Sequence, residues 1–206
     1  MSVQQLGSYA QLIREWQSKG YLPATSGNFS MRDGELGCYV TASGRDKQFL
    51  EPSDFIQIDL DGNLRDPSRG VKSSAETRIH LCIYQAFDQI CYIGHTHSPY
   101  ATLLSQYYHA NQEIVFQGWE ILKGFRGVED HLGTEVLPII ANSQDMGYFE
   151  KELPSVFESY PALHGFLIAG HGLYTWGESL NELKRHLEVW EFLFKLEQLQ
   201  LGLEKA

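Results

Sequence analysis

The chain contains 206 residues, of which 43% are hydrophobic and 13% aromatic, and its formal net charge is −10. This length fits one domain, and the apolar content is enough to bury a full core, which excludes a disordered chain. The negative charge excludes a nucleic-acid-binding protein, because no basic surface is available to neutralise a phosphate backbone. A small anionic substrate stays compatible with it, since local amides and cations outweigh the net charge within one Debye length.

The three cysteines are odd in number, widely spaced and without a Cys-x-x-Cys pair, which excludes a disulfide framework and a thiolate metal site. The first 16 residues lack the basic and apolar segments of a secretory signal. No apolar run reaches the roughly 18 residues that a membrane span requires. We therefore expect a cytoplasmic protein that has no membrane partner.

In chain order, the first predicted element is an amphipathic helix over residues 9–19, with Leu12, Ile13 and Trp16 on one face. Short strands are predicted at residues 29–31, 38–41 and 55–60, and the last of them ends in a strong turn signal, Asp61-Gly62-Asn63.

The next element is a helix over residues 74–87, which Ser73 or Ser74 can cap. A short buried strand at residues 91–94 then leads into a helix that starts at Ser98-Pro99. Core strands follow at 136–141 and 165–169, and a long helix runs from Ser179 towards residue 201. This alternation, without repeat or linker, predicts a single α/β domain over residues 1–206, built as a sandwich of helices around a mixed sheet.

Two histidines, His95 and His97, stand one residue apart where a buried strand ends. That spacing places both imidazoles on one face of a strand, because side chains alternate with period 2. His171 has a similar position, after an apolar run and between two glycines. Three neutral histidines with an open fourth position are typical of a catalytic zinc centre, whereas a structural centre has four protein ligands.

On its own, a His-x-His pair is a weak signal, because two histidines at a strand end are also ordinary surface residues. The third histidine in the same setting favours the metal site. The remaining histidines lack such a setting and are interpreted as structural or surface residues: His80, His109, His131, His164 and His186. Imidazole ligands suit zinc, iron, nickel and manganese to differing degrees, so the donor set leaves the native metal open.

Three short segments combine hydroxyl groups with exposed backbone N–H groups, which is the combination that binds a phosphate. Each segment alone is equally well a turn or a helix cap. Arg45 and Lys72, beside two of the segments, either add positive charge or are solvated surface residues. The candidate phosphate-binding residues are Ser26, Gly27, Asn28, Thr41, Ser43, Gly44, Ser73 and Ser74.

Taken together, these motifs resemble the class II aldolase family, whose members are zinc-dependent enzymes acting on sugar phosphates. The order and spacing agree for S-G-N-F-S at 26–30, T-A-S-G at 41–44, S-S-A-E-T at 73–77, H-T-H-S at 95–98 and A-G-H-G at 169–172. The resemblance implies a three-layer α/β/α sandwich around a mainly antiparallel sheet. It also implies one zinc ion per subunit, held by His95, His97 and His171, a small phosphorylated ketose as substrate, and a homotetramer with active sites near subunit contacts.

Further runs resemble members of the family that dehydrate a ketose 1-phosphate, among them S-G-R-D-K at 43–47 and W-E-I-L-K-G at 119–124. By this resemblance Glu120 moves the protons of the reaction, although its sequence context alone fits an ordinary exposed glutamate. Glu76 stands where aldolases of the family carry a glutamate near the zinc, while the animal dehydratases have a cysteine there. Both carboxylates are therefore candidate catalytic residues.

Two alternatives to a dehydratase stay open at this point. An aldolase or epimerase acting on another sugar phosphate would use the same metal and phosphate sites. A metal-bearing binding or adaptor protein would have them without catalysis, which an intact set of three histidines and the phosphate turns disfavour.

Overall fold

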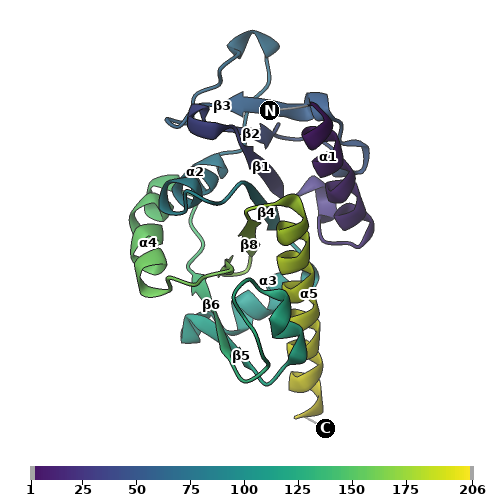
Figure 1. Cartoon of the computed structure of the whole chain (residues 1–206), viewed down its shortest axis with the longest axis vertical. Helices are drawn as coiled ribbons and strands as arrows, with labels where there is room; N and C mark the ends of the chain where they lie inside the picture. The colour runs from purple at the N-terminus through teal and green to yellow at the C-terminus, as the bar shows by residue number, and fades with distance from the viewer. Residues whose placement is uncertain (1–2, 205–206) are drawn as a thin grey trace.

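The computed structural model describes residues 3–204, and its centre is an eight-stranded sheet with the order β3-β2-β1-β4-β8-β7-β6-β5 (Figure 1). The strands are β1 (Asn28–Arg32), β2 (Cys38–Thr41), β3 (Phe55–Ile58), β4 (Tyr92–Thr96), β5 (Glu113–Gln117), β6 (Thr134–Ile140), β7 (Gly165–Ile168) and β8 (Gly172–Gly177). The helices are α1 (Val3–Ser18), α2 (Thr77–Ala86), α3 (Pro99–Tyr107), α4 (Met146–Ser159) and α5 (Leu180–Leu203).

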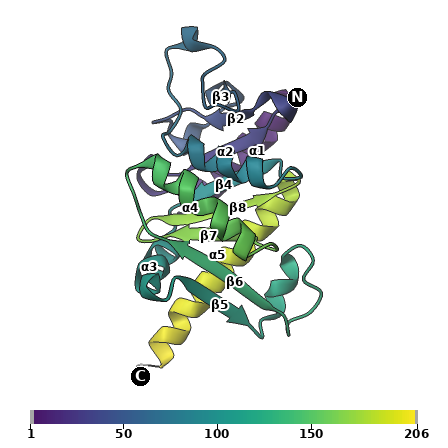
Figure 2. The ribbon, with the colours of Figure 1, turned by 90° about the vertical axis from the view of Figure 1, so that its left-hand side faces the viewer.

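Within the described sheet, β6 and β7 are the parallel pair, and every other neighbouring pair is antiparallel. Parallel neighbours need a crossover of a dozen or more residues, and α4 provides it by crossing one face of the sheet between them (Figure 2). The predicted mixed, mainly antiparallel sheet is thereby confirmed.

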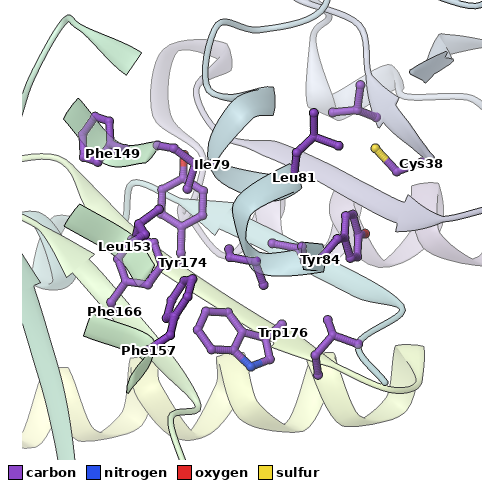
Figure 3. Close-up of a cluster of buried hydrophobic side chains, with 14 of the residues drawn as sticks. Cys38, Ile79, Leu81, Tyr84, Phe149, Leu153, Phe157, Phe166, Tyr174 and Trp176 are labelled. Carbon is purple, nitrogen blue, oxygen red and sulfur yellow. The ribbon is translucent and has the colours of Figure 1, made fainter. Parts of the chain in front are cut away.

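Helices cover both faces of the sheet, with α2 and α4 on one side and α1 and α5 on the other (Figure 1). Beneath α2 and α4 lies a buried cluster in which Leu153 and Phe157 pack on Phe166 and Trp176 of the sheet (Figure 3). On the opposite face, α1, α3 and α5 bury two further clusters. Burial of one such large apolar side chain contributes about 1.5–3 kcal/mol, so both helical layers are firmly attached to the sheet.

Several predicted boundaries agree with the structure, and others are wrong. Ser98 and Ser179 cap their helices as expected, each accepting a hydrogen bond from a backbone N–H three residues on. The prediction that Ser73 or Ser74 caps a helix starting at residue 74 is wrong, because α2 starts at Thr77 and Glu76 occupies the N-cap position. A bridge between Ala42 and Ser73 holds the preceding segment against the end of β2 instead.

The first helix begins at Val3, ahead of the predicted start, and α4, β5 and β8 were not predicted. All three cysteines are free thiols. Among residues 3–204, no helix combines the length and the apolar character needed to cross a bilayer. The predicted domain also includes residues 1–2 and 205–206, which lie outside the described residues.

Candidate functional site

The three predicted metal ligands meet because β4 and β8 are neighbours. His95 is the fourth residue of β4 and His97 follows its last residue, while His171 lies in the turn that joins β7 to β8. That turn is closed by the His171 N–H, which donates to the carbonyl of Ile168 over 3.0 Å. Pairing of β4 with β8 then places the turn beside the end of β4.

The glycines on either side of His171 are both required by the backbone. Gly170 has φ +63° at the third position of the turn, where a type II turn demands a positive φ. At Gly172, a Cβ atom would lie 2.0 Å from the carbonyl oxygen of Thr96, which leaves no room for a side chain. The two glycines therefore allow the turn and the close approach of the backbone that bring His171 beside β4.

The ring nitrogens of the three histidines point at one another. The Nε2 atoms of His97 and His95 are 2.8 Å apart, and those of His95 and His171 are 3.3 Å apart. The Nδ1–H of His95 donates to the carbonyl of Leu173 over 2.9 Å, which leaves the Nε2 lone pair of His95 facing the group. Burial and the neighbouring imidazoles lower the pKa of His95 well below its usual value and that of His97 to about 4.

Neutral imidazole nitrogens facing one another repel unless a cation or a proton lies between them. Ligand nitrogens at about 2.0–2.1 Å from a tetrahedral zinc ion lie roughly 3.3 Å apart, close to the spacings of this group. All the candidate ligand atoms of His95, His97 and His171 lie within 4.8 Å of one another, so the group can hold a metal ion.

Glu76 adds a carboxylate to the histidine group. Its Oε1 lies 3.1 Å from Nε2 of His171, its Oε2 lies 3.9 Å from Nε2 of His95, and Oε2 also accepts a hydrogen bond from the Asn28 amide. Burial alone raises the pKa of Glu76, but the hydrogen bond with His171 and the electrostatic interaction with the surrounding imidazoles outweigh it and lower the pKa well below its usual range. Glu76 is therefore an anion that faces the three histidines, and at its N-cap position the side chain makes no capping hydrogen bond to α2.

The three predicted phosphate-binding segments also come together. A cavity of about 180 Å³ is lined by Ser26, Gly27, Asn28, Thr41, Ser43, Gly44 and Ser74, together with Lys47, Glu76 and His97. Ser73 is not among the lining residues, and its backbone pairs with Ala42 beside the cavity. The hydroxyl of Ser26 is buried without a hydrogen-bond partner, as expected for a group that a ligand satisfies.

Lys47, a cation in the lining of this cavity, was not predicted from the sequence. Its side chain is 2% exposed, and its Nζ donates to the carbonyls of Thr25 at 3.1 Å and Arg45 at 2.9 Å. An ammonium has three N–H groups, so one is left for a ligand. Burial lowers the pKa of Lys47 from its usual value. Of the two cations that were suggested instead, Arg45 pairs with Asp54 over 3.2 Å and Lys72 is exposed.

A second cavity of about 700 Å³ shares His97 and Glu76 with the first. Its walls include His171, Leu103 and Asn142, which mix apolar and polar groups. The histidine group thus borders both a small polar cavity and a larger one.

Glu120 is not brought to the histidine group within one chain. It is the first residue of the short 3₁₀ helix η7 (Glu120–Gly124), and it lines neither cavity. Its side chain is 70% exposed, and its carboxylate pairs with Lys123 at 2.5 Å and His131 at 3.6 Å. The hydrogen bond with Lys123 lowers the pKa of Glu120.

Comparison with known proteins identifies the family to which the chain belongs. Residues 8–198 match the family described as Class II Aldolase and Adducin N-terminal domain. The chain is 46% identical to methylthioribulose-1-phosphate dehydratase of Picosynechococcus sp. over 190 residues, which cover 92% of this chain and 89% of that protein. It is 40% identical to the enzyme of the same name from Yersinia enterocolitica, over 94% of this chain and 90% of that protein.

Among solved structures, L-fuculose-1-phosphate aldolase from Thermus thermophilus superposes with a TM-score of 0.78 over 100% of both chains, at 21% sequence identity. The chain belongs to the class II aldolase family. The family and the fold expected from the motifs are therefore confirmed.

Proposed function

We propose that the chain is a hydro-lyase that converts 5-methylthioribulose 1-phosphate into 2,3-diketo-5-methylthiopentyl 1-phosphate in methionine salvage. One observation carries this proposal: the histidine group and the cavity lined by hydroxyls and Lys47 share His97 and Glu76 as a common wall. A substrate that binds there places its phosphate and its reacting carbons within one site. The names of the relatives at 46% and 40% identity support the choice of substrate.

Different residues of this chain bind the phosphate and the metal ion in the proposed reaction. Lys47 and the hydroxyls of Ser26 and Ser43 bind the phosphate, which fixes the distance of the ketone from the histidines. We propose one zinc ion per subunit on His95, His97 and His171; when bound there, it supplies a Lewis acid for the charge that develops on the ketone oxygen. The negative Glu76 beside the ligands favours a cation at that position.

Dehydration removes the proton from C3 and the hydroxyl from C4. The C3 proton is acidified by the neighbouring ketone, and a carboxylate accepts it while a proton goes to the departing hydroxyl, so that one water leaves. The enol that results becomes the C3 ketone by moving its hydroxyl proton to C4. We assign the removal of the C3 proton and the delivery of a proton to the departing hydroxyl to Glu120, with Glu76 as the other candidate.

Because Glu120 lies outside the cavities of its own chain, we propose that it serves the site of a neighbouring subunit in a homotetramer. Two features support this arrangement: the exposure of Glu120 on η7, and the exposure of Phe192 on α5, which is 50% accessible in the single chain. Leu199 and Leu203 are exposed on the same helix, and several exposed apolar side chains along one helix, unlike a single one, are typical of a surface that a partner covers.

The test replaces Glu120 by Gln. General acid–base catalysis contributes about 100–10,000-fold, so turnover of 5-methylthioribulose 1-phosphate should fall by a factor in that range while zinc content stays at one per chain. Glu129→Gln, a change of an exposed carboxylate in the same segment, is the matched control and should keep normal turnover. Turnover near the wild-type level in the Glu120 variant would remove Glu120 from the mechanism. Cleavage of fuculose 1-phosphate in place of dehydration would establish the aldolase alternative.

Mixed oligomers test the neighbouring-subunit arrangement. Co-expression of Glu120→Gln chains with His171→Ala chains combines intact histidines and an intact Glu120 at roughly a quarter of the sites if the two come from different subunits. Activity should then reappear in the mixture, although each variant alone is inactive. A mixture as inactive as its parents would show that Glu120 acts within its own chain.

A further inference from the structure

A row of buried hydrogen bonds runs from Glu76 into the layer between the sheet and α2. The Asn28 amide nitrogen donates to Oε2 of Glu76, and the amide oxygen of Asn28 contacts Nε2 of His80. On the far side of the ring, Nδ1 of His80 lies 2.7 Å from Oγ of Ser30, which lies 2.8 Å from the hydroxyl of Tyr84.

Two regular elements place these residues. Asn28 and Ser30 are two apart on β1 and therefore share a face of the strand. Glu76, His80 and Tyr84 are four apart along α2 and its N-cap, and therefore share a face of the helix. The two rows of side chains alternate, and Tyr84 at the inner end belongs to the buried cluster under α2 (Figure 3).

The donors and acceptors allow one arrangement of protons. The NH2 group of Asn28 donates to Oε2 of Glu76, so the amide oxygen of Asn28 must accept from Nε2–H of His80. Burial lowers the pKa of His80 to about 3, so the ring is neutral and its Nδ1 accepts from the hydroxyl of Ser30. The Ser30 oxygen then accepts from Tyr84, whose alternative acceptor, the carbonyl of Cys91, is farther away at 3.4 Å.

We propose that His80 is a positioning residue for Glu76. Every proton in the row points towards the carboxylate, and His80 fixes which end of the Asn28 amide faces Glu76. Without the Nε2–H of His80, the amide is free to turn its oxygen towards the carboxylate, and the two oxygens repel. His80 itself is fully buried and lines neither cavity, so it acts on the metal group through Asn28 and Glu76.

The experiment compares His80→Leu with His80→Gln. Loss of residues that orient metal ligands from behind typically costs about 10–100-fold in metal affinity or activity, so the Leu variant should lose that much zinc affinity and kcat, with a smaller change in KM. The Gln variant keeps an N–H donor towards Asn28 and should recover most of both. Zinc affinity is measured on metal-free protein by competition with a chromophoric chelator.

The matched control is Tyr9→Phe, which removes a buried hydrogen bond of 2.7 Å to the carbonyl of Ile93 from the opposite side of the sheet. It should lower the free energy of unfolding without changing zinc affinity or kcat. Equal losses in the Leu and Gln variants, or wild-type zinc affinity in the Leu variant, would overturn the proposal.

If His80→Leu does not fold, Ser30→Ala provides the test, because it removes the donor that sets the tautomer of His80. A smaller loss in both readouts is expected, and no change in either would overturn the proposal. The turnover readout rests on the proposed dehydration, whereas the zinc readout rests only on metal binding by the three histidines. A wild-type chain that fails to dehydrate 5-methylthioribulose 1-phosphate would therefore refute the proposed function and leave the role of His80 to the zinc titration.

Discussion

Two groups of histidines lie at opposite ends of β7, and they differ in what their ring nitrogens contact. His171 follows β7 and faces His95 and His97, and its own Nδ1 is buried without a partner. His164 precedes β7, and its two nitrogens contact a carboxylate oxygen of Glu135 and the carbonyl of Arg126, both at 2.9 Å.

The second group consists of His164 and His186, and each of its ring nitrogens has a hydrogen-bond partner within the protein. Nδ1 of His186 contacts the carbonyl of Trp176 at 2.8 Å, and the backbone N–H of Arg126 donates to Nε2 of His186 at 3.2 Å. This group also borders a cavity, of about 260 Å³, so burial and an adjacent cavity do not distinguish the two groups. The difference is that the Nε2 atoms of the first group face one another, and this convergence identifies a candidate metal site better than the number of histidines does.

The largest effect is expected from His171→Ala. The variant should bind less than one zinc ion per chain and lose at least about 1,000-fold in turnover, equivalent to about 4 kcal/mol of transition-state stabilisation. Metal analysis and a turnover assay on the purified variant measure both, with the exposed His109→Ala as control. Full zinc content in the His171 variant would contradict the assignment of the metal site to the first group of histidines.

At the opposite end, His164→Leu should affect stability and leave the metal in place. It leaves the buried carboxylate of Glu135 without its partner, which typically costs about 3–5 kcal/mol. Urea unfolding measures this loss, and His164→Gln, which keeps one donor, should lose less. A fall in zinc content in His164→Leu would show that the second group also contributes to metal binding.

The pH dependence of unfolding tests the second group in another way. Burial lowers the pKa of His186 to about 4, whereas in the unfolded chain the histidine binds a proton with its ordinary pKa of 6.5. The folded state is therefore favoured above about pH 6.5, and about 3 kcal/mol is lost as the pH falls from there to about 4. His186→Gln should make this decline shallower in urea unfolding at about pH 7.5 and about pH 5. An unchanged decline would mean that His186 does not carry it.

The smallest effect is expected from Lys47→Met, which removes the cation from the cavity beside the first group. A hydrogen bond to a charged group contributes about 1.5–3 kcal/mol, so KM for the phosphorylated substrate should rise by about 10–100-fold with little change in kcat. Lys72→Met, a change of an exposed lysine near the same cavity, should leave KM unchanged. An equal rise of KM in the two variants would mean that Lys47 acts only through its long-range charge and does not contact the phosphate.

Local patterns predicted those parts of the fold that local chemistry determines. The bounds of β2 and the caps Ser98 and Ser179 follow from alternation and from side-chain hydrogen bonds within a few residues. The helix α4 was missed because Pro154 lies inside it, and a proline within an apolar pattern usually indicates a helix end.

The site was predicted where a residue type and its immediate neighbours carry the signal, as for the histidines and the hydroxyl-rich turns. Lys47 and His80 were missed because their roles depend on partners distant in sequence, such as Thr25 and Asn28. The role expected of Glu120 came from resemblance alone. The structure of a single chain does not explain that role, because Glu120 lines neither cavity.

The turn that carries His171 is fixed by the hydrogen-bonded pairing of β4 with β8, which extends over five residue pairs. Small zinc domains unfold when their ion is removed, because the ion is what closes their structure. Here the backbone already holds the ligands in place, so chelation should leave the circular dichroism spectrum of the fold intact. A bound metal ion can then exchange without unfolding of the protein. The metal found in a given sample should therefore depend on which ions were available, in addition to the preference of the imidazole ligands.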